Sequence, residues 1–121
     1  MRFMIIVRAT PDTEAGIFPE DDTLMAAMAS YHEELTQAGV LLDAAGLQPS
    51  AKGWQIRHGS DGRRRVVDGP FAEAKEMIGG FFLLDCDTQA EAVAIASECP
   101  AAEWAAVEVR EIGPCHQHRA S

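Results

Sequence analysis

The order of the apolar segments is the feature that most constrains the fold of this chain. Short apolar stretches typical of strands alternate with two amphipathic helical stretches in the order β-α-β, hairpin, β-α-β. The expected strands span residues 2–9, 40–46, 54–58, 64–67, 77–85 and 105–112. This order matches the split β-α-β motif and predicts an α+β, ferredoxin-like domain with an inserted hairpin. We expect the domain over residues 1–112 and a C-terminal tail over 113–121.

The two helices are predicted from helical spacing and from start and stop signals. An acidic loop over residues 10–22 leads into the first helix, whose apolar stripe recurs at spacings of four, three and four and which runs to about residue 38. The stripe consists of Leu24, Met28, Tyr31 and Leu35, and Gly39 supplies the stop. Thr88 and Glu91 form a capping-box pattern at the start of the second helix, which Pro100 ends.

The strands carry apolar side chains on both faces, which has a consequence for assembly. In the first strand Phe3 and Ile5 alternate with Met4 and Ile6, and the run FFLL at 81–84 repeats this pattern. Two helices cover only one face of such a sheet, so the other face needs a partner. The simplest partner is a second copy, and the sequence therefore predicts a homodimer. In the hairpin, Trp54, Ile56 and His58 alternate with Gln55 and Arg57, which is typical of a half-exposed strand.

The charge of the chain excludes two classes of partner. The net charge is −9 over 121 residues, whereas nucleic acids and anionic membranes both require a basic face. The basic run at 63–65 falls at the expected hairpin tip, where we interpret it as solvated turn charge. No signal peptide or membrane-spanning stretch is expected, and three widely spaced cysteines form no disulfide framework. A cytoplasmic location is predicted.

The segment DGPFAEAKE at 68–76 has two interpretations. As a corner, Asp68 accepts backbone N–H groups, Gly69 and Pro70 make a turn and Phe71 plugs the core. As a site, charged side chains converge at a strand edge. The candidate roles are then Asp68 for orientation, Glu73 as base, Lys75 as anion holder, and Phe71 and Glu76 as ligand contacts. We favour the corner, although both can hold in part.

Other candidate groups are fewer. His32 borders the apolar stripe of the first helix beside Tyr31, and it is a candidate general base in a pocket between helix and sheet, with Tyr31 as a ligand contact. The structural alternative, a hydrogen-bonded border histidine, is the commoner case. The tail residues Cys115, His116 and His118 form one cluster, whereas structural zinc normally needs four ligands from two, so no metal is predicted. No nucleotide- or flavin-binding pattern is present, so no cofactor is expected.

The DGPF segment also carries a resemblance to a known family. Residues 68–73 (DGPFAE), 75–76 (KE) and 79–81 (GGF) resemble the YCII-related proteins, specifically the branch named for its DGPF motif. The opening MRFMIIVRAT, the stretch AGVLLDAAGLQPS and the closing VEVREI are also similar. Ala74 stands where the family usually has Thr, which removes one hydroxyl from the candidate site.

The resemblance implies a dimeric α/β barrel built from ferredoxin-like subunits. Some members of the wider family are enzymes that use a His–Asp pair, including a dechlorinating enzyme of aromatic breakdown, but that pair is not clearly present here. Other DGPF members occur beside extracytoplasmic-function sigma factors. Three hypotheses follow: a homodimeric small-molecule-binding or accessory module, a lyase or hydrolase that uses acid–base chemistry, and a regulatory partner of a sigma factor.

Overall fold

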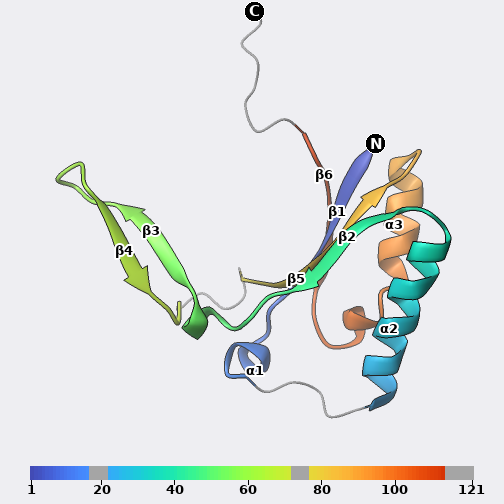
Figure 1. The fold of residues 1–121 in the computed structure, drawn as a ribbon, viewed down its shortest axis with the longest axis horizontal. Coiled ribbons are helices and arrows are strands. Elements are labelled where there is room, and N and C mark those ends of the chain that lie inside the picture. Colours follow the sequence, from blue (N-terminus) through green and yellow to red (C-terminus); the bar gives the residue numbers. More distant parts are fainter. Residues whose placement is uncertain (17–21, 72–76, 114–121) are drawn as a thin grey trace, which may run out of the picture.

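The computed structural model describes residues 1–16, 22–71 and 77–113, which form a mixed α+β fold with antiparallel sheets (Figure 1). The strands are β1 (Arg2–Arg8), β2 (Leu41–Gly46), β3 (Trp54–His58), β4 (Arg64–Asp68), β5 (Ile78–Asp85) and β6 (Val107–Glu111). The helices are α1 (Pro11–Glu14), α2 (Asp22–Gln37) and α3 (Gln89–Ser97), with 3-10 turns at Ser50–Lys52 (η1) and Pro100–Glu103 (η3).

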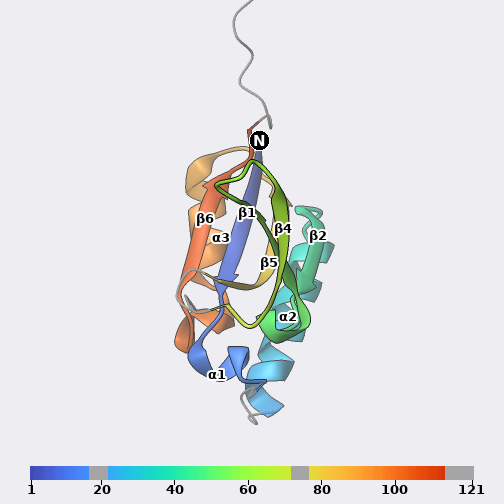
Figure 2. The same ribbon diagram turned by 90° about the vertical axis from the view of Figure 1, so that its left-hand side faces the viewer.

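Four strands form the main sheet in the order β2-β5-β1-β6, with every neighbouring pair antiparallel. Helices α2 and α3 cover one face of this sheet (Figures 1 and 2). The core lies between these two helices and the sheet, where Phe3, Ile5 and Leu84 are almost completely buried. Tyr31 and Leu35 of the predicted apolar stripe pack into the same core.

The opposite face of the main sheet, which we call the open face, carries no helix among the described residues (Figure 2). The strand register places Met4 beside Leu83 and Ile6 beside Phe81 on this face. Ile6 is buried by its neighbours, whereas Met4, Phe81 and Leu83 are half-buried. The predicted second apolar face is therefore present in the single chain.

The expected helix ends agree closely with the structure, with one correction. Gly39 has φ +75°, and the N–H groups of Gly39 and Val40 donate to the carbonyls of Thr36 and Leu35, which ends α2. Thr88 caps α3 by accepting the N–H of Glu91 at 3.1 Å. In a capping box the Glu91 carboxylate would also accept the N–H of Thr88. Here it accepts the N–H of Asp87, one residue earlier.

The loop expected over 10–22 is the clearest difference from the sequence prediction, because it contains the short helix α1. Thr10 and Thr13 form a reciprocal cap, in which Thr13 N–H donates to Thr10 Oγ1 at 3.1 Å and Thr10 N–H donates to Thr13 Oγ1 at 2.8 Å. Pro11 stands at the first helical position, where its missing N–H costs nothing. This turn places Glu14 near the end of β1 and the start of β5.

Strands β3 and β4 form a separate two-stranded sheet that projects from the body (Figure 1). We call this hairpin, residues 54–68, the arm. It lies on the open-face side of the main sheet, away from α2 and α3, in both views (Figures 1 and 2). Its apolar face is open to solvent, with Trp54 and Ile56 67% and 63% exposed.

Candidate functional site

The DGPF segment begins with a corner that is fastened to the turn η1. The Gly69–Pro70 peptide is cis, and Gly69 N–H donates to the carbonyl of Gly53 at 2.9 Å. A Cβ atom on Gly69 would lie 1.7 Å from the Ser50 carbonyl oxygen, so only glycine fits. Phe71 N–H donates to Ser50 Oγ at 3.1 Å. These contacts support the turn at Gly69 and Pro70 in the corner interpretation, whereas Asp68 is exposed and Phe71 only half-buried.

Glu14 completes this corner from a distant part of the chain. One carboxylate oxygen accepts Ser50 N–H at 3.0 Å, and the other accepts the Ser50 hydroxyl. Because Ser50 Oγ in turn accepts Phe71 N–H, a hydrogen-bonded chain runs from Glu14 through Ser50 to the DGPF turn. Sequence reasoning did not single out Glu14. The available signal was the Thr-Pro-x-Thr capping pattern at 10–13, which predicts a short helix ending at Glu14.

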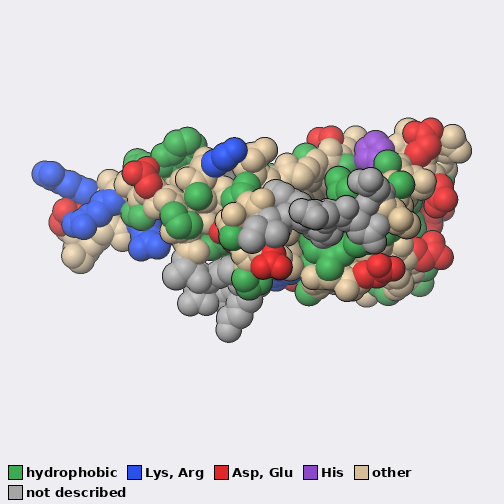
Figure 3. Space-filling model, turned by 90° about the horizontal axis from the view of Figure 1, so that it is seen from below, with side chains coloured by type: hydrophobic (Ala, Val, Ile, Leu, Met, Phe, Trp, Pro, Cys, Tyr) green, Lys and Arg blue, Asp and Glu red, His purple; other side chains and the backbone are tan. Residues whose placement is uncertain are grey.

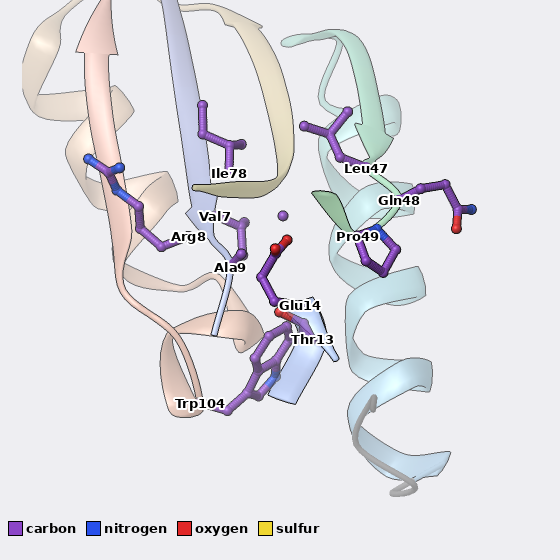
Figure 4. A pocket seen from close by; sticks show the side chains of 11 residues that line it. Val7, Arg8, Ala9, Thr13, Glu14, Leu47, Gln48, Pro49, Ile78 and Trp104 are labelled. Carbon is purple, nitrogen blue, oxygen red and sulfur yellow. The ribbon is translucent and has the colours of Figure 1, made fainter. Parts of the chain in front are cut away.

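A small cavity of about 60 Å³ adjoins the Glu14 side chain (Figure 4). Its walls come from the ends of β1 and β5, from α1, from the loop after β2 and from Trp104. In Figure 4 the Glu14 carboxylate lies between Val7 and Pro49, below Ile78. The Arg8 side chain points away from Glu14 and pairs with Glu108, Nη2 to Oε1, at 2.5 Å. The cavity therefore has one carboxylate wall and otherwise largely apolar walls.

A much larger cleft of about 510 Å³ opens between α2 and the main sheet. Small residues of β2 and β5 make the room for it, since Ala44, Gly46, Gly79 and Gly80 fill little space. Helix α2 contributes Met25, Met28, Ala29 and His32 to the other wall. A cleft of this size, with mostly apolar walls and few polar groups, is typical of a small-molecule site.

Trp104 connects the two cavities. It lines both of them together with Val7 and Gly79. Its indole Nε1–H is buried and has no hydrogen-bond partner within the described ranges. An unpaired buried donor costs about 1–3 kcal/mol, so this N–H favours an acceptor at that position. The large cleft thus has mostly apolar walls, and one of the residues in them, Trp104, carries a buried donor that is unpaired among the described residues.

The two candidate residues of α2 have different positions. His32 is solvent-exposed and lines the cleft, with its ring centroid 6.5 Å from that of Phe82. Tyr31 is buried on the core side, where its ring meets Phe82 edge-on at 5.3 Å. The Tyr31 hydroxyl donates to the carbonyl of Ile95 at 2.6 Å and so joins α2 to α3. Tyr31 does not line either cavity.

The single tyrosine gives a test of this placement, because burial raises the pKa of the Tyr31 hydroxyl well above its ordinary value of about 10. The folded protein should develop no tyrosinate absorbance as the pH passes about 10, whereas the chain in denaturant should titrate there. Since the unfolded state releases this proton first, stability should fall as pH rises above about 10. Titration of the native protein near its ordinary pKa would contradict the buried hydroxyl.

The remaining candidate residues lie in the arm, just after it, or outside the described residues. Asp68 is exposed at the end of β4, paired in register with Trp54, and lines neither cavity. Phe71 is half-buried and lines a shallow hollow with Glu14 and Ser50. Glu73, Lys75 and Glu76 lie outside the described residues, as do the tail residues Cys115, His116 and His118.

The part of the chain that the structure describes offers neither a metal-binding cluster nor a membrane-spanning helix. Within those ranges no three His, Cys, Asp or Glu side chains cluster closely enough to hold a metal ion. None of the described helices is long and apolar enough to cross a membrane.

Comparison with known proteins identifies the family of this chain. Residues 1–116 match the YCII-related domain, and the chain therefore belongs to the YCII-related family. It is 37% identical over 86 residues to the uncharacterized protein R00369 of Rhizobium meliloti (strain 1021), covering 71% of this chain and 68% of that protein.

A solved structure shares the fold at low identity. It is the 5-chloro-2-hydroxyhydroquinone dehydrochlorinase TftG from Burkholderia phenoliruptrix AC1100, in complex with 2,5-dihydroxybenzoquinone. The TM-score is 0.53 at 17% identity, over 93% of this chain and 94% of that one. At this identity the similarity concerns the fold alone.

Proposed function

We propose that this chain is a homodimeric binding module for a small, flat, largely apolar molecule that carries a hydrogen-bond acceptor. The observation that carries the proposal is the cleft of about 510 Å³ between α2 and the main sheet, whose wall includes Trp104 with its buried Nε1–H unpaired among the described residues. The apolar walls select the body of the ligand, and the indole donor orients it. His32 is a second polar group on the wall formed by α2.

The chemical class of the ligand is a hydroxylated six-membered ring. TftG, which shares the fold, holds 2,5-dihydroxybenzoquinone. Such a ring is flat, has ring oxygens to accept the Trp104 N–H, and is far smaller than the cleft. This supports its use as the first probe, together with the corresponding hydroquinone.

Calorimetric titration with 2,5-dihydroxybenzoquinone tests the proposal. Trp104→Phe keeps an aromatic ring and removes the donor, so binding should weaken about tenfold, the worth of one hydrogen bond of about 1.4 kcal/mol. Trp54→Phe, which changes the other tryptophan of the chain on the exposed arm, is the matched control and should bind unchanged. Equal binding by the parent and Trp104→Phe would contradict the assigned donor, and no binding of either ring would remove this ligand class.

The acid–base hypothesis is a second candidate, supported by the position of His32 in the wall of the cleft. His32 then serves as the proton carrier, with Asp68 and Glu73 as the other predicted carriers. The enzyme is favoured over the binding module if the parent turns over a ring substrate and His32→Gln still binds the ring but no longer turns it over. The sigma-factor hypothesis stays a prediction from the family resemblance.

We also propose the finer classification and the assembly. The strand order β2-β5-β1-β6 with α2 and α3 on one face supports a ferredoxin-like subunit. The open face, with Met4, Phe81 and Leu83 half-buried, supports pairing of two copies through their sheets as a dimeric α/β barrel. The DGPF turn at 68–71 supports the DGPF branch, and a cytoplasmic location accords with the free buried thiols of Cys86 and Cys99.

A further inference from the structure

The exposed face of the arm is unusual for a surface hairpin. Trp54, Ile56 and Val66 are 67%, 63% and 67% exposed, and Ile56 and Val66 are direct cross-strand partners. These three large apolar side chains therefore form one patch, which we call the arm patch. An isolated two-stranded hairpin is marginally stable in water, and a contiguous apolar patch marks an interaction surface.

The position of the arm limits what can cover this patch. The arm lies on the same side of the main sheet as the open face, opposite α2 and α3 (Figures 1 and 2). The described hydrogen bonds of residues 54–68 join arm residues to one another, and the bond from Gly69 N–H to the carbonyl of Gly53 closes the chain just below the base of the arm. A molecule that covers the open face consequently lies beside the arm.

The distribution of charge indicates which molecule covers the arm patch. Residues 54–68 contain four arginines, at 57 and 63–65, against Asp61 and Asp68, which gives a net charge of +2. The whole chain carries −9, so the remainder carries −11. Figure 3 shows this separation on one face, with blue side chains at the arm end and red ones gathered toward the opposite end. The surface that best complements a basic, apolar arm is thus the acidic body of another copy.

We propose that the arm docks on the body of a second copy, so that each subunit of a two-fold dimer is clasped by the arm of its partner. This rests on the homodimer proposed above and goes beyond it, since the sheets can pair with or without the arms. The arm patch becomes buried, and the arginines at its tip face the acidic surface of the partner. Two-fold symmetry repeats the contact, so the interface contains it twice, once for each arm.

Sedimentation equilibrium of the full chain over a wide concentration range tests the docking. The double variant Trp54→Ser/Ile56→Ser removes the arm patch, and its dimer dissociation constant should rise by at least about 30-fold, as for an interface hot spot. Gln55→Ser, a half-buried residue on the other face of β3, is the control and should leave the constant unchanged. Arg64→Glu, which reverses a charge in register with His58 beside the patch, should weaken the dimer as well.

A fluorescence readout separates failure of the arm from failure of the dimer. In Trp104→Phe protein the remaining tryptophan is Trp54, whose emission should shift to shorter wavelength as protein concentration drives dimerisation. Leu83→Glu on the open face should abolish both the dimer and this shift. A parent that stays monomeric at every concentration overturns both proposals. The other outcome is a dimer whose dissociation constant is unchanged in Trp54→Ser/Ile56→Ser and in which Trp54 emission does not depend on concentration. That outcome overturns the docking of the arm but leaves the dimer in place.

Discussion

A Gly69→Ala protein is expected to lose about 3 kcal/mol of unfolding free energy or more. The added Cβ would lie 1.7 Å from a backbone oxygen of Ser50, which cannot rotate away as a side chain can. The DGPF turn and η1 must separate to admit it, and the hydrogen bond from Gly69 to Gly53 is then lost as well. Denaturant unfolding with a linear extrapolation measures the difference.

The control for this variant is Gly113→Ala, because a Cβ at Gly113 meets no atom of the described residues within 4 Å and Gly113 has no positive φ. Its stability should equal that of the parent within about 0.5 kcal/mol. If Gly69→Ala is as stable as Gly113→Ala, the close packing of the DGPF turn on η1 is wrong.

The second large effect is expected at the carboxylate that secures this corner. Glu14→Ala leaves the Ser50 N–H and hydroxyl without their charged acceptor, and hydrogen bonds to charged groups contribute about 1.5–3 kcal/mol. We therefore expect a loss of about 2 kcal/mol. Ser50→Ala should cost about 1–2 kcal/mol, because Phe71 N–H then loses its acceptor.

A double-mutant cycle shows whether Glu14 acts through Ser50. The double variant should be about 1 kcal/mol more stable than the sum of the single effects predicts, since both remove the same contact. Ser60→Ala, at the exposed tip of the arm, is the control and should be neutral. Strict additivity of the Glu14 and Ser50 effects would mean that the hydrogen-bonded chain does not form.

The sequence predicted the large elements of the fold because their signals are periodic. The stripe that includes Tyr31 and Leu35 and the two-faced strands at 2–9 and 77–85 are repeated patterns, and single substitutions do not blur them. The short helix α1 and the 3-10 turn η1 were missed because three or four residues are too few to show a period. Glu14 was missed for the same reason, and its partner Ser50 is 36 positions away.

The candidate site was less predictable because its main feature is empty space. Ala44, Gly46, Gly79 and Gly80 open the cleft by being small, which is not a chemical motif. His32, whose place in a pocket between helix and sheet was one of two interpretations of the sequence, lines this cleft. The charged residues of the DGPF motif pointed to the corner instead. Trp104 has no sequence signal, since a buried donor without a partner appears only once the fold is known.

The arm shows a further limit of pattern reading. Alternation in β3 predicts one exposed and one covered face, and the chain alone exposes the face with Trp54 and Ile56. Under the docking proposed above, a second copy covers this face. The same reasoning applies to Met4 and Leu83 on the open face.

The most direct test of the central claim is an NMR titration of the ¹⁵N-labelled protein with the quinone probe. The chain contains two tryptophans, so the indole region of the spectrum reports on Trp104 in the cleft and Trp54 on the arm separately. We predict that the Trp104 Nε1–H signal shifts saturably toward that of a hydrogen-bonded indole, while the Trp54 signal does not move. A saturable shift of Trp54 with Trp104 unchanged would place the ligand elsewhere and contradict the assigned site.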